Sequence, residues 1–232
     1  MRSEPGSERG GIVTFLALTV VVVVAGAGAF WWFFVRSDAA PPPKIEDTNL
    51  ATGGTLDGPW VIRPGGESFV QYRVKEQFAG AVIQTDATGT TNDVTATMTI
   101  HGDTVSGVTV TANLVALKSD KDRRDRAIRD NGLQSNQFPT ATFVLSQPIT
   151  LAQAPQKGEK ITTTATGTLT LHGITRTVSL PLQGRWDGTS VQVVGTMPIR
   201  FVDYGITPPN IGGFVSVGGT GKIELQLFFA HG

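Results

Sequence analysis

The sequence predicts one all-β domain preceded by a single membrane-spanning helix. Three observations lead to this prediction: an uncharged apolar segment near the N-terminus, a short segment rich in proline and glycine, and a long region with apolar residues at every second position. A period of two is typical of strands with one buried face. The expected order is a cytoplasmic tail (1–11), a transmembrane helix (12–35), a linker (36–57) and a β domain (58–232).

The apolar segment Ile12–Val35 contains no charged residue. As an α-helix it would rise about 36 Å, enough to cross a hydrocarbon core of about 30 Å. A cleaved signal peptide is the alternative, since small residues follow at 37–39, but its apolar region would span only about 7–15 residues. Basic residues flank the helix equally, so orientation rests on its N-terminal position. We expect a retained anchor in the cell membrane and an extracytoplasmic domain.

Residues 36–57 combine three consecutive prolines with a Gly-Gly pair. Proline stiffens a chain into an extended conformation, and glycine loosens it. We therefore expect an extended spacer that lifts the domain off the bilayer.

Strands are expected wherever apolar and polar residues alternate, and glycine-rich pairs such as Gly102-Asp103 and Gly218-Gly219 separate them as hairpin turns. About eight strands without a long helix favour a β-sandwich or an up-and-down antiparallel barrel, and an eight-stranded barrel can enclose one small ligand. The alternating runs cover residues 69–74, 94–100, 108–114, 169–171, 178–182, 191–201 and 223–229.

The charge-dense segment Leu117–Phe138 interrupts this alternation and predicts one short helix. Asp120 or Asp122 is expected to cap the helix, and Asn131-Gly132 to end it. Its arginines have two interpretations. They pair with neighbouring aspartates on a solvated face, or they lie at the mouth of a pocket and bind a phosphate group.

Composition excludes several functions. Lysine plus arginine equal aspartate plus glutamate at 19 each, so no basic field would attract nucleic acid, and the absence of cysteine excludes disulfides and thiolate metal sites. His101 and His172 share a T-x-H-G setting but lack a third ligand at coordinating spacing. No G-x-S-x-G sequence marks a serine nucleophile. We expect no enzyme, no metal and no cofactor.

Two segments, in order, resemble the YceI-like family: RRDRAIRDNGLQSNQFPTATF (Arg123–Phe143) and GTLTLHGITRTVSLPL (Gly167–Leu182). The first is similar to the family's arginine-aspartate element and its aromatic-proline step, and the second to its strand-turn-strand motif. Similarity at residues 60–62 and 201–206 extends the resemblance over about 58–229. The chain departs at Arg63, where the family has aspartate, and at Glu67 and Glu76, where it has histidine.

The resemblance implies a lipocalin-like, eight-stranded antiparallel barrel that holds a polyisoprenoid, such as a prenyl phosphate or a quinone. We expect a membrane-anchored protein that binds such a lipid, or a similar long apolar lipid, through a mouth near Arg123–Phe138. The alternatives are a structural or interaction barrel filled by its own side chains, and a lipid-modifying enzyme.

The expected ligand-binding residues are apolar positions on the inward strand faces together with three polar candidates. A one-residue slip in register would reverse these faces. The set comprises Phe69 or Val70, Tyr72, Phe138, Phe143, Leu169, Leu171, Val178, Leu180, Met197, Ile199, Phe201 and Tyr204, with Arg124, Arg126 and His172 as the polar candidates.

Overall fold

The computed structural model describes residues 24, 32, 36–47, 49–78, 84–211 and 215–232. The chain divides into two units, residues 1–37 and 38–232, and the second contains the β domain. The predicted membrane-spanning segment Ile12–Val35 lies outside the described residues, apart from Val24 and Trp32. Within the described part of the chain, no helix has the length and apolar character needed to cross a bilayer.

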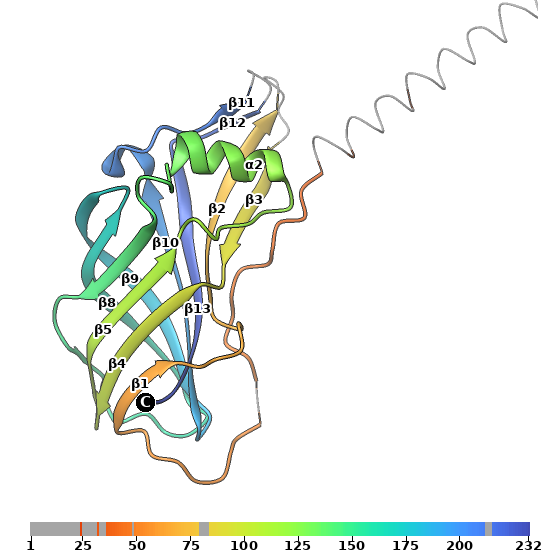
Figure 1. Cartoon of the computed structure of the whole chain (residues 1–232). Coiled ribbons are helices and arrows are strands. Elements are labelled where there is room, and N and C mark those ends of the chain that lie inside the picture. Colours follow the sequence, from red (N-terminus) through yellow and green to blue (C-terminus); the bar gives the residue numbers. More distant parts are fainter. Residues whose placement is uncertain (1–23, 25–31, 33–35, 48, 79–83, 212–214) are drawn as a thin grey trace, which may run out of the picture. The chain divides into compact units, whose positions relative to one another are not determined.

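The second unit is a closed antiparallel barrel (Figure 1). Eight strands follow one another around it, and the ring closes because the first pairs with the last, with Trp60 opposite His231. The prediction of an antiparallel barrel is therefore confirmed, and the sandwich alternative is wrong. The strands are β1 (Gly58–Ile62), β4 (Val94–His101), β5 (Thr104–Asn113), β6 (Thr140–Leu145), β8 (Lys160–Leu171), β9 (Ile174–Trp186), β10 (Ser190–Arg200) and β13 (Thr220–His231).

Alternation of apolar and polar residues positions the core. In β4, Val94, Ala96, Met98 and Ile100 are buried while the threonines between them and His101 are exposed. The apolar positions of the other strands join the same core inside the barrel. Each strand therefore turns one face toward the core, because that apolar face leaves water on folding.

A second hairpin extends the wall beside β13. Strand β2 (Phe69–Phe78) pairs with residues 222–226 of β13, next to the stretch that pairs with β1, and β3 (Gln84–Thr91) pairs with β2. Strand β3 also forms one isolated antiparallel bridge, in which Thr90 pairs with Lys118. Three short strands complete the sheet: β7 (Ile149–Thr150), β11 (Asn210–Ile211) and β12 (Val215–Val217).

The predicted helical excursion is present as α2 (Asp122–Ala127), which continues as one π-helical turn, η2 (Ile128–Gly132). The expected cap is wrong. Lys121 occupies the N-cap position without a side-chain cap bond, because Asp120 pairs with Arg124 instead. Figure 1 shows α2 across the end of the barrel opposite β1. A short 3₁₀ helix, η3 (Phe201–Tyr204), follows β10.

Residues 38–47 and 49–57, expected to belong to an extended spacer that lifts the domain off the bilayer, pack along the outside of the barrel. Gln192 on β10 accepts a hydrogen bond from the Glu46 backbone N–H (2.8 Å) and donates one to the Lys44 carbonyl (3.0 Å). Ile45 between them is buried. We call residues 38–57 the strap. Proline does extend this segment, but its backbone groups find partners on the barrel, so the segment is held rather than free.

The strap runs from the α2 end of the barrel to the opposite end. At its start, the Asp38 backbone N–H donates to Asp120, just before α2 (3.2 Å). Further along, the Ala51 N–H donates to the Asp187 carbonyl in the β9–β10 turn (2.8 Å). The strap also covers a polar cluster on the outer barrel face, where Arg73 donates to Glu224 (2.9 Å) and to the Ala40 carbonyl of the strap.

Candidate functional site

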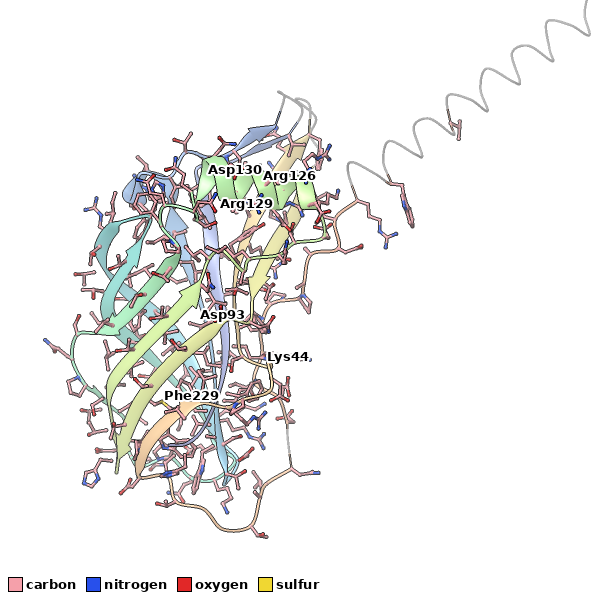
Figure 2. The ribbon with its side chains drawn as sticks, in the orientation of Figure 1. Lys44, Asp93, Arg126, Arg129, Asp130 and Phe229 are labelled. Atoms are coloured by element: carbon pink, nitrogen blue, oxygen red, sulfur yellow. The ribbon has the colours of Figure 1, made fainter. Side chains whose placement is uncertain are left out.

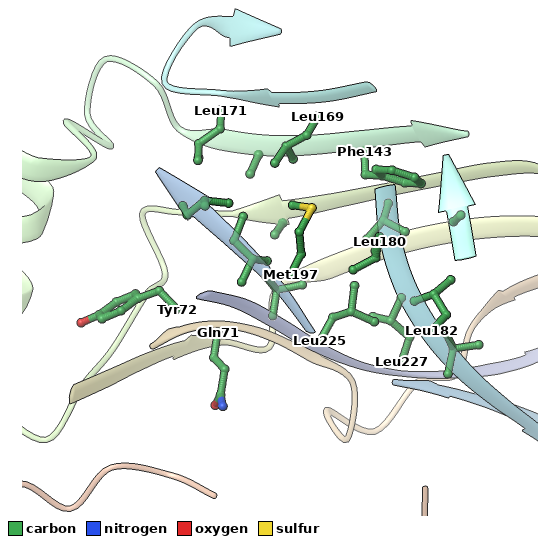
Figure 3. A pocket seen from close by; sticks show the side chains of 18 of the residues that line it. Gln71, Tyr72, Phe143, Leu169, Leu171, Leu180, Leu182, Met197, Leu225 and Leu227 are labelled. Atoms are coloured by element: carbon green, nitrogen blue, oxygen red, sulfur yellow. The ribbon is translucent and has the colours of Figure 1, made fainter. Parts of the chain in front are cut away.

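An apolar cavity of about 260 Å³ lies inside the barrel. Its wall comes from the barrel strands, from β2 and from α2, and it consists mainly of valine, leucine, isoleucine, methionine and phenylalanine side chains. Figure 3 shows leucines from separate strands and Met197 converging on this space. The cavity extends from Ala127 and Ile128 at the α2 end to Leu56 and Trp186 at the β1 end.

Nine of the sequence-predicted residues lie on the cavity wall. Seven of them lie in runs that alternation had marked as strands, whereas Phe143 lies on β6 and Arg124 on α2. The nine are Tyr72, Phe143, Leu169, Leu171, Leu180, Met197, Ile199, Phe201 and Arg124. On β2 the inward face carries Val70 and Tyr72. Of the two alternatives predicted there, Val70 therefore lies on the wall and Phe69 points outward.

Six predicted residues lie away from the wall. Phe69 is on the outer face of β2, Val178 packs into the core beside the cavity, and Arg126 is exposed on α2 (Figure 2). The other three meet at the β8–β9 turn and η3: the Phe138 ring packs on His172 (ring centroids 4.4 Å apart), and His172 bonds the Tyr204 carbonyl (3.0 Å).

His172 has a conformational role in this structure. It adopts a positive φ of 52°, as does Gly173 at 74°, so the two residues form the tight turn between β8 and β9. His101, in the similar sequence setting, instead ends β4 with its side chain 91% exposed. The repeated motif therefore reflects two different local structures. The described residues contain no group of three or more metal-ligating side chains.

Arg124 is the charged centre of the α2 end. Its guanidinium donates to both carboxylate oxygens of Glu76 (2.7 and 2.8 Å) and also pairs with Asp120. Burial works against the charge of Arg124, but the two carboxylates outweigh it and raise the pKa of Arg124 above its ordinary value. Burial likewise opposes ionisation of Asp120, but the Arg124 charge lowers the pKa of Asp120. Arg124 and Asp120 therefore both carry charge at neutral pH.

Asp125 has a structural role at the start of α2. Its carboxylate accepts hydrogen bonds from the backbone and hydroxyl of Ser119 (2.9 and 2.6 Å), which holds the chain just before α2. On the exposed side of the helix, Arg129 pairs with Asp130 (3.3 Å; Figure 2). The arginine cluster thus divides into one buried residue that faces the cavity and others directed toward the surface.

Two residues of the cavity wall carry a neutral donor atom that is almost fully buried. The donors are the Tyr72 hydroxyl, at the α2 end, and the Trp186 indole N–H, at the β1 end. Burial raises the pKa of Tyr72 above its ordinary value, so the hydroxyl keeps its proton. Figure 3 shows the Tyr72 hydroxyl directed away from the leucine cluster.

Sequence reasoning missed several wall residues. Leu225, Leu227 and Phe229 belong to an alternating run that was recognised as a strand, so the same period would have placed them on the wall. Glu76 was noticed only as a departure from the family pattern. Its role depends on Arg124, 48 positions away, and no local pattern connects the two.

A closed antiparallel barrel around an apolar cavity defines a class of proteins that bind small apolar molecules. The YceI-like domain model matches residues 60–229, and the chain belongs to this family. The match spans the barrel from β1 to β13. The family resemblance predicted from the sequence is therefore confirmed.

Two solved structures share the fold. A polyisoprenoid-binding domain from Saccharophagus degradans implicated in plant cell wall breakdown superposes with a TM-score of 0.56 at 15% identity, covering 75% of this chain and 98% of that one. BcnA from Burkholderia cenocepacia gives a TM-score of 0.52 at 20% identity, covering 70% and 96%. A search of curated protein sequences finds no match.

Proposed function

We propose that this protein is a membrane-anchored binding protein for a polyisoprenoid or a similar long apolar lipid. The observation that carries the proposal is the continuous apolar cavity inside the barrel. Burying an apolar tail there contributes about 0.8 kcal/mol per CH₂-sized unit and needs no catalytic group. The fold shared with a polyisoprenoid-binding domain supports the same ligand class.

The α2 end is the proposed entrance. At the β1 end, Trp60 and Phe229 are almost fully buried, and Trp186 and Leu56 lie beside the cavity, so large side chains obstruct that end. At the α2 end the wall includes the small residues Ala127 and Gly132. A short helix can move aside with less loss of hydrogen bonding than a strand in a closed sheet.

The anchor is proposed on the sequence of Ile12–Val35. The strap supports a particular orientation, because Asp38, its first residue, contacts Asp120 at the α2 end. Two residues, Arg36 and Ser37, separate Val35 from Asp38, so the three steps between them span at most about 10 Å. An anchor that ends at Val35 would therefore keep the entrance close to the bilayer in which the ligand dissolves.

The two alternatives receive less support. A barrel filled by its own side chains would leave no cavity of this size. A lipid-modifying enzyme would need a base free to act at the cavity, but Glu76 on the wall is bonded to Arg124 through both oxygens. His172 lies off the wall with one ring nitrogen engaged by the Tyr204 carbonyl. We therefore propose binding without turnover. Lipid turnover by the purified chain that His172→Ala abolishes would contradict this.

Filling the cavity tests the proposal. Ala165 lies on the wall and is buried, whereas its neighbour Thr164 points outward and is exposed. We expect Ala165→Phe to remove most co-purified lipid, measured by mass spectrometry of lipid extracts from the full chain, because the ring occupies the tail's volume. Thr164→Phe, the matched control, should retain it. Absence of lipid from the unmodified protein, after expression and after incubation with isoprenoids, would overturn the proposal.

A further inference from the structure

The charges of residues 38–232 are divided unevenly between the two ends of the barrel. The α2 end comprises the start of the strap, α2 with its flanks and its partner Glu76, the β8–β9 turn, η3 with the end of β10, and the start of β13. It carries nine cations and seven carboxylates, a net formal charge of +2: Lys118, Lys121, Arg123, Arg124, Arg126, Arg129, Arg176, Arg200 and Lys222 against Asp38, Glu76, Asp120, Asp122, Asp125, Asp130 and Asp203. The rest of residues 38–232 carries seven cations and ten carboxylates, a net formal charge of −3. A chain that is neutral overall therefore has one basic end.

The cations of the α2 end point outward more than its carboxylates do. Glu76 and Asp125 are buried, with side chains 6% and 8% exposed. Arg126 and Lys222 are exposed and have no hydrogen-bond or carboxylate partner in the described part of the chain. Arg176, also exposed, donates to a backbone carbonyl of η3 (3.0 Å), which does not neutralise its charge. These three cations can therefore bind an anion outside the protein.

An exposed apolar side chain lies beside these cations. Val202 on η3 is 68% exposed, and it follows Arg200, which is exposed to the same extent. Basic side chains next to an apolar one suit the boundary between lipid head groups and acyl chains. This combination favours an anionic membrane over a soluble polyanion, because a membrane offers an apolar layer directly beneath its negative charge.

The basic end is also the end that the proposed anchor would hold at the bilayer. The strap begins there, and the cavity wall reaches Ala127 and Ile128 of the same end. Attraction between a basic side chain and anionic lipid falls off within a Debye length, about 10 Å at 0.1 M salt. Only cations on the side turned toward the membrane therefore contribute.

We propose that the α2 end is a docking surface for an anionic membrane, on which Arg126, Arg176 and Lys222 contact lipid phosphates. This inference rests on the proposed anchor, which keeps the barrel near the bilayer. Docking then fixes which end of the barrel faces the lipid, and it holds the proposed entrance against the head groups.

The test uses the full chain in liposomes that carry a head-group quencher and consist of phosphatidylcholine alone or mixed with phosphatidylglycerol. A fluorophore on Thr207→Cys, exposed just after η3, distinguishes docked from undocked barrels by its quenched and unquenched lifetimes. We expect phosphatidylglycerol to raise the docked fraction at low salt, and high salt to return it to the phosphatidylcholine level, because ions screen exposed charges. Equal docking on the two compositions would overturn the inference.

Matched substitutions test the surface itself. Arg126→Gln and Lys222→Gln each remove one cation, so each should lower the ratio of docked to undocked barrel about fivefold on the anionic liposomes. The control is Lys44→Gln, an equal charge change on an exposed part of the strap that binds Gln192, toward the β1 end; it should leave the ratio unchanged. An equal loss in Lys44→Gln, or no loss in either α2-end variant, would overturn the role of this surface.

The proposed function is judged separately in the same preparations. Lipid extracts of the chain report whether the cavity is loaded, and an empty cavity with intact docking would contradict lipid binding while this inference stands. A chain that fails to float with the liposomes would contradict the anchor, and the docking inference with it.

Discussion

Arg124 links helix α2 to strand β2. The charge pattern of the sequence predicts the helix, but no sequence pattern connects it with β2. Its guanidinium reaches from α2 to Glu76 on β2, and both side chains are almost fully buried. Seen as a local motif, Arg124 is one of several arginines on a polar helix. Its distinct role comes from burial, since a charge taken out of water must find a partner.

Removing one partner of this pair should be costly. We expect Arg124→Met to lower the free energy of unfolding by about 3–5 kcal/mol, because Glu76 is left buried without its hydrogen-bonding partner. In the double variant Arg124→Met with Glu76→Leu, most of that loss should be recovered, since no buried charge remains at the site. Urea unfolding of all four members of the cycle gives the coupling. Additive effects of the two single substitutions would contradict the interpretation.

At the scale of elements, alternation located the long strands but not the strands whose inward residues are small. Strand β3 has the sequence QTDATGTT, which has no apolar period, and its Gly89 leaves room for the Tyr72 ring. The strap was misread for a similar reason. Its prolines and polar residues indicate an extended chain, but the partners that hold it, Gln192 and Asp187, lie more than 130 positions away.

Gln192 should control whether the strap stays on the barrel. Its side chain makes two hydrogen bonds to the strap backbone, one on each side of the buried Ile45. We expect Gln192→Ala to increase amide hydrogen exchange selectively in residues 44–51, because the lost bonds, worth about 1 kcal/mol each, held this segment closed.

The matched control for the strap is Gln183→Ala, on the neighbouring strand β9, where the side chain makes no described bond to the strap. It should leave exchange in residues 44–51 unchanged. Faster exchange throughout β10 and β13 in Gln192→Ala would mean that the variant destabilises the barrel as a whole, which would contradict a local role.

At the scale of the whole molecule, closure of the barrel is the feature that local patterns predict least. Strands β1 and β13 lie at opposite ends of the domain sequence, yet Trp60 pairs with His231 and Ile62 with Phe229. Alternation shows that each strand has an inward face but not which strands are neighbours. The cavity wall follows only after closure, which explains why strand faces were largely predicted while the wall at the two barrel ends was not.

The strap leads to a prediction about how the whole molecule meets the membrane. The chain contains no cysteine, so single substitutions can be labelled selectively. We choose Arg126→Cys, exposed on α2, and His101→Cys, exposed at the β1 end. With a fluorophore at each site, the full chain is reconstituted into liposomes that carry a head-group quencher. We expect stronger quenching at position 126, because the strap begins at Asp38 beside Asp120, within about 10 Å of chain from Val35.

A flexible insertion after Ser37 is the control for this orientation. About twenty glycine and serine residues have a root-mean-square span of roughly 25 Å, which frees the barrel to tumble at the bilayer surface. The difference between the two sites should then shrink, although the protein stays attached. Equal or stronger quenching at position 101 in the unmodified chain would contradict an entrance that faces the membrane, and a chain that does not float with the liposomes would contradict the anchor.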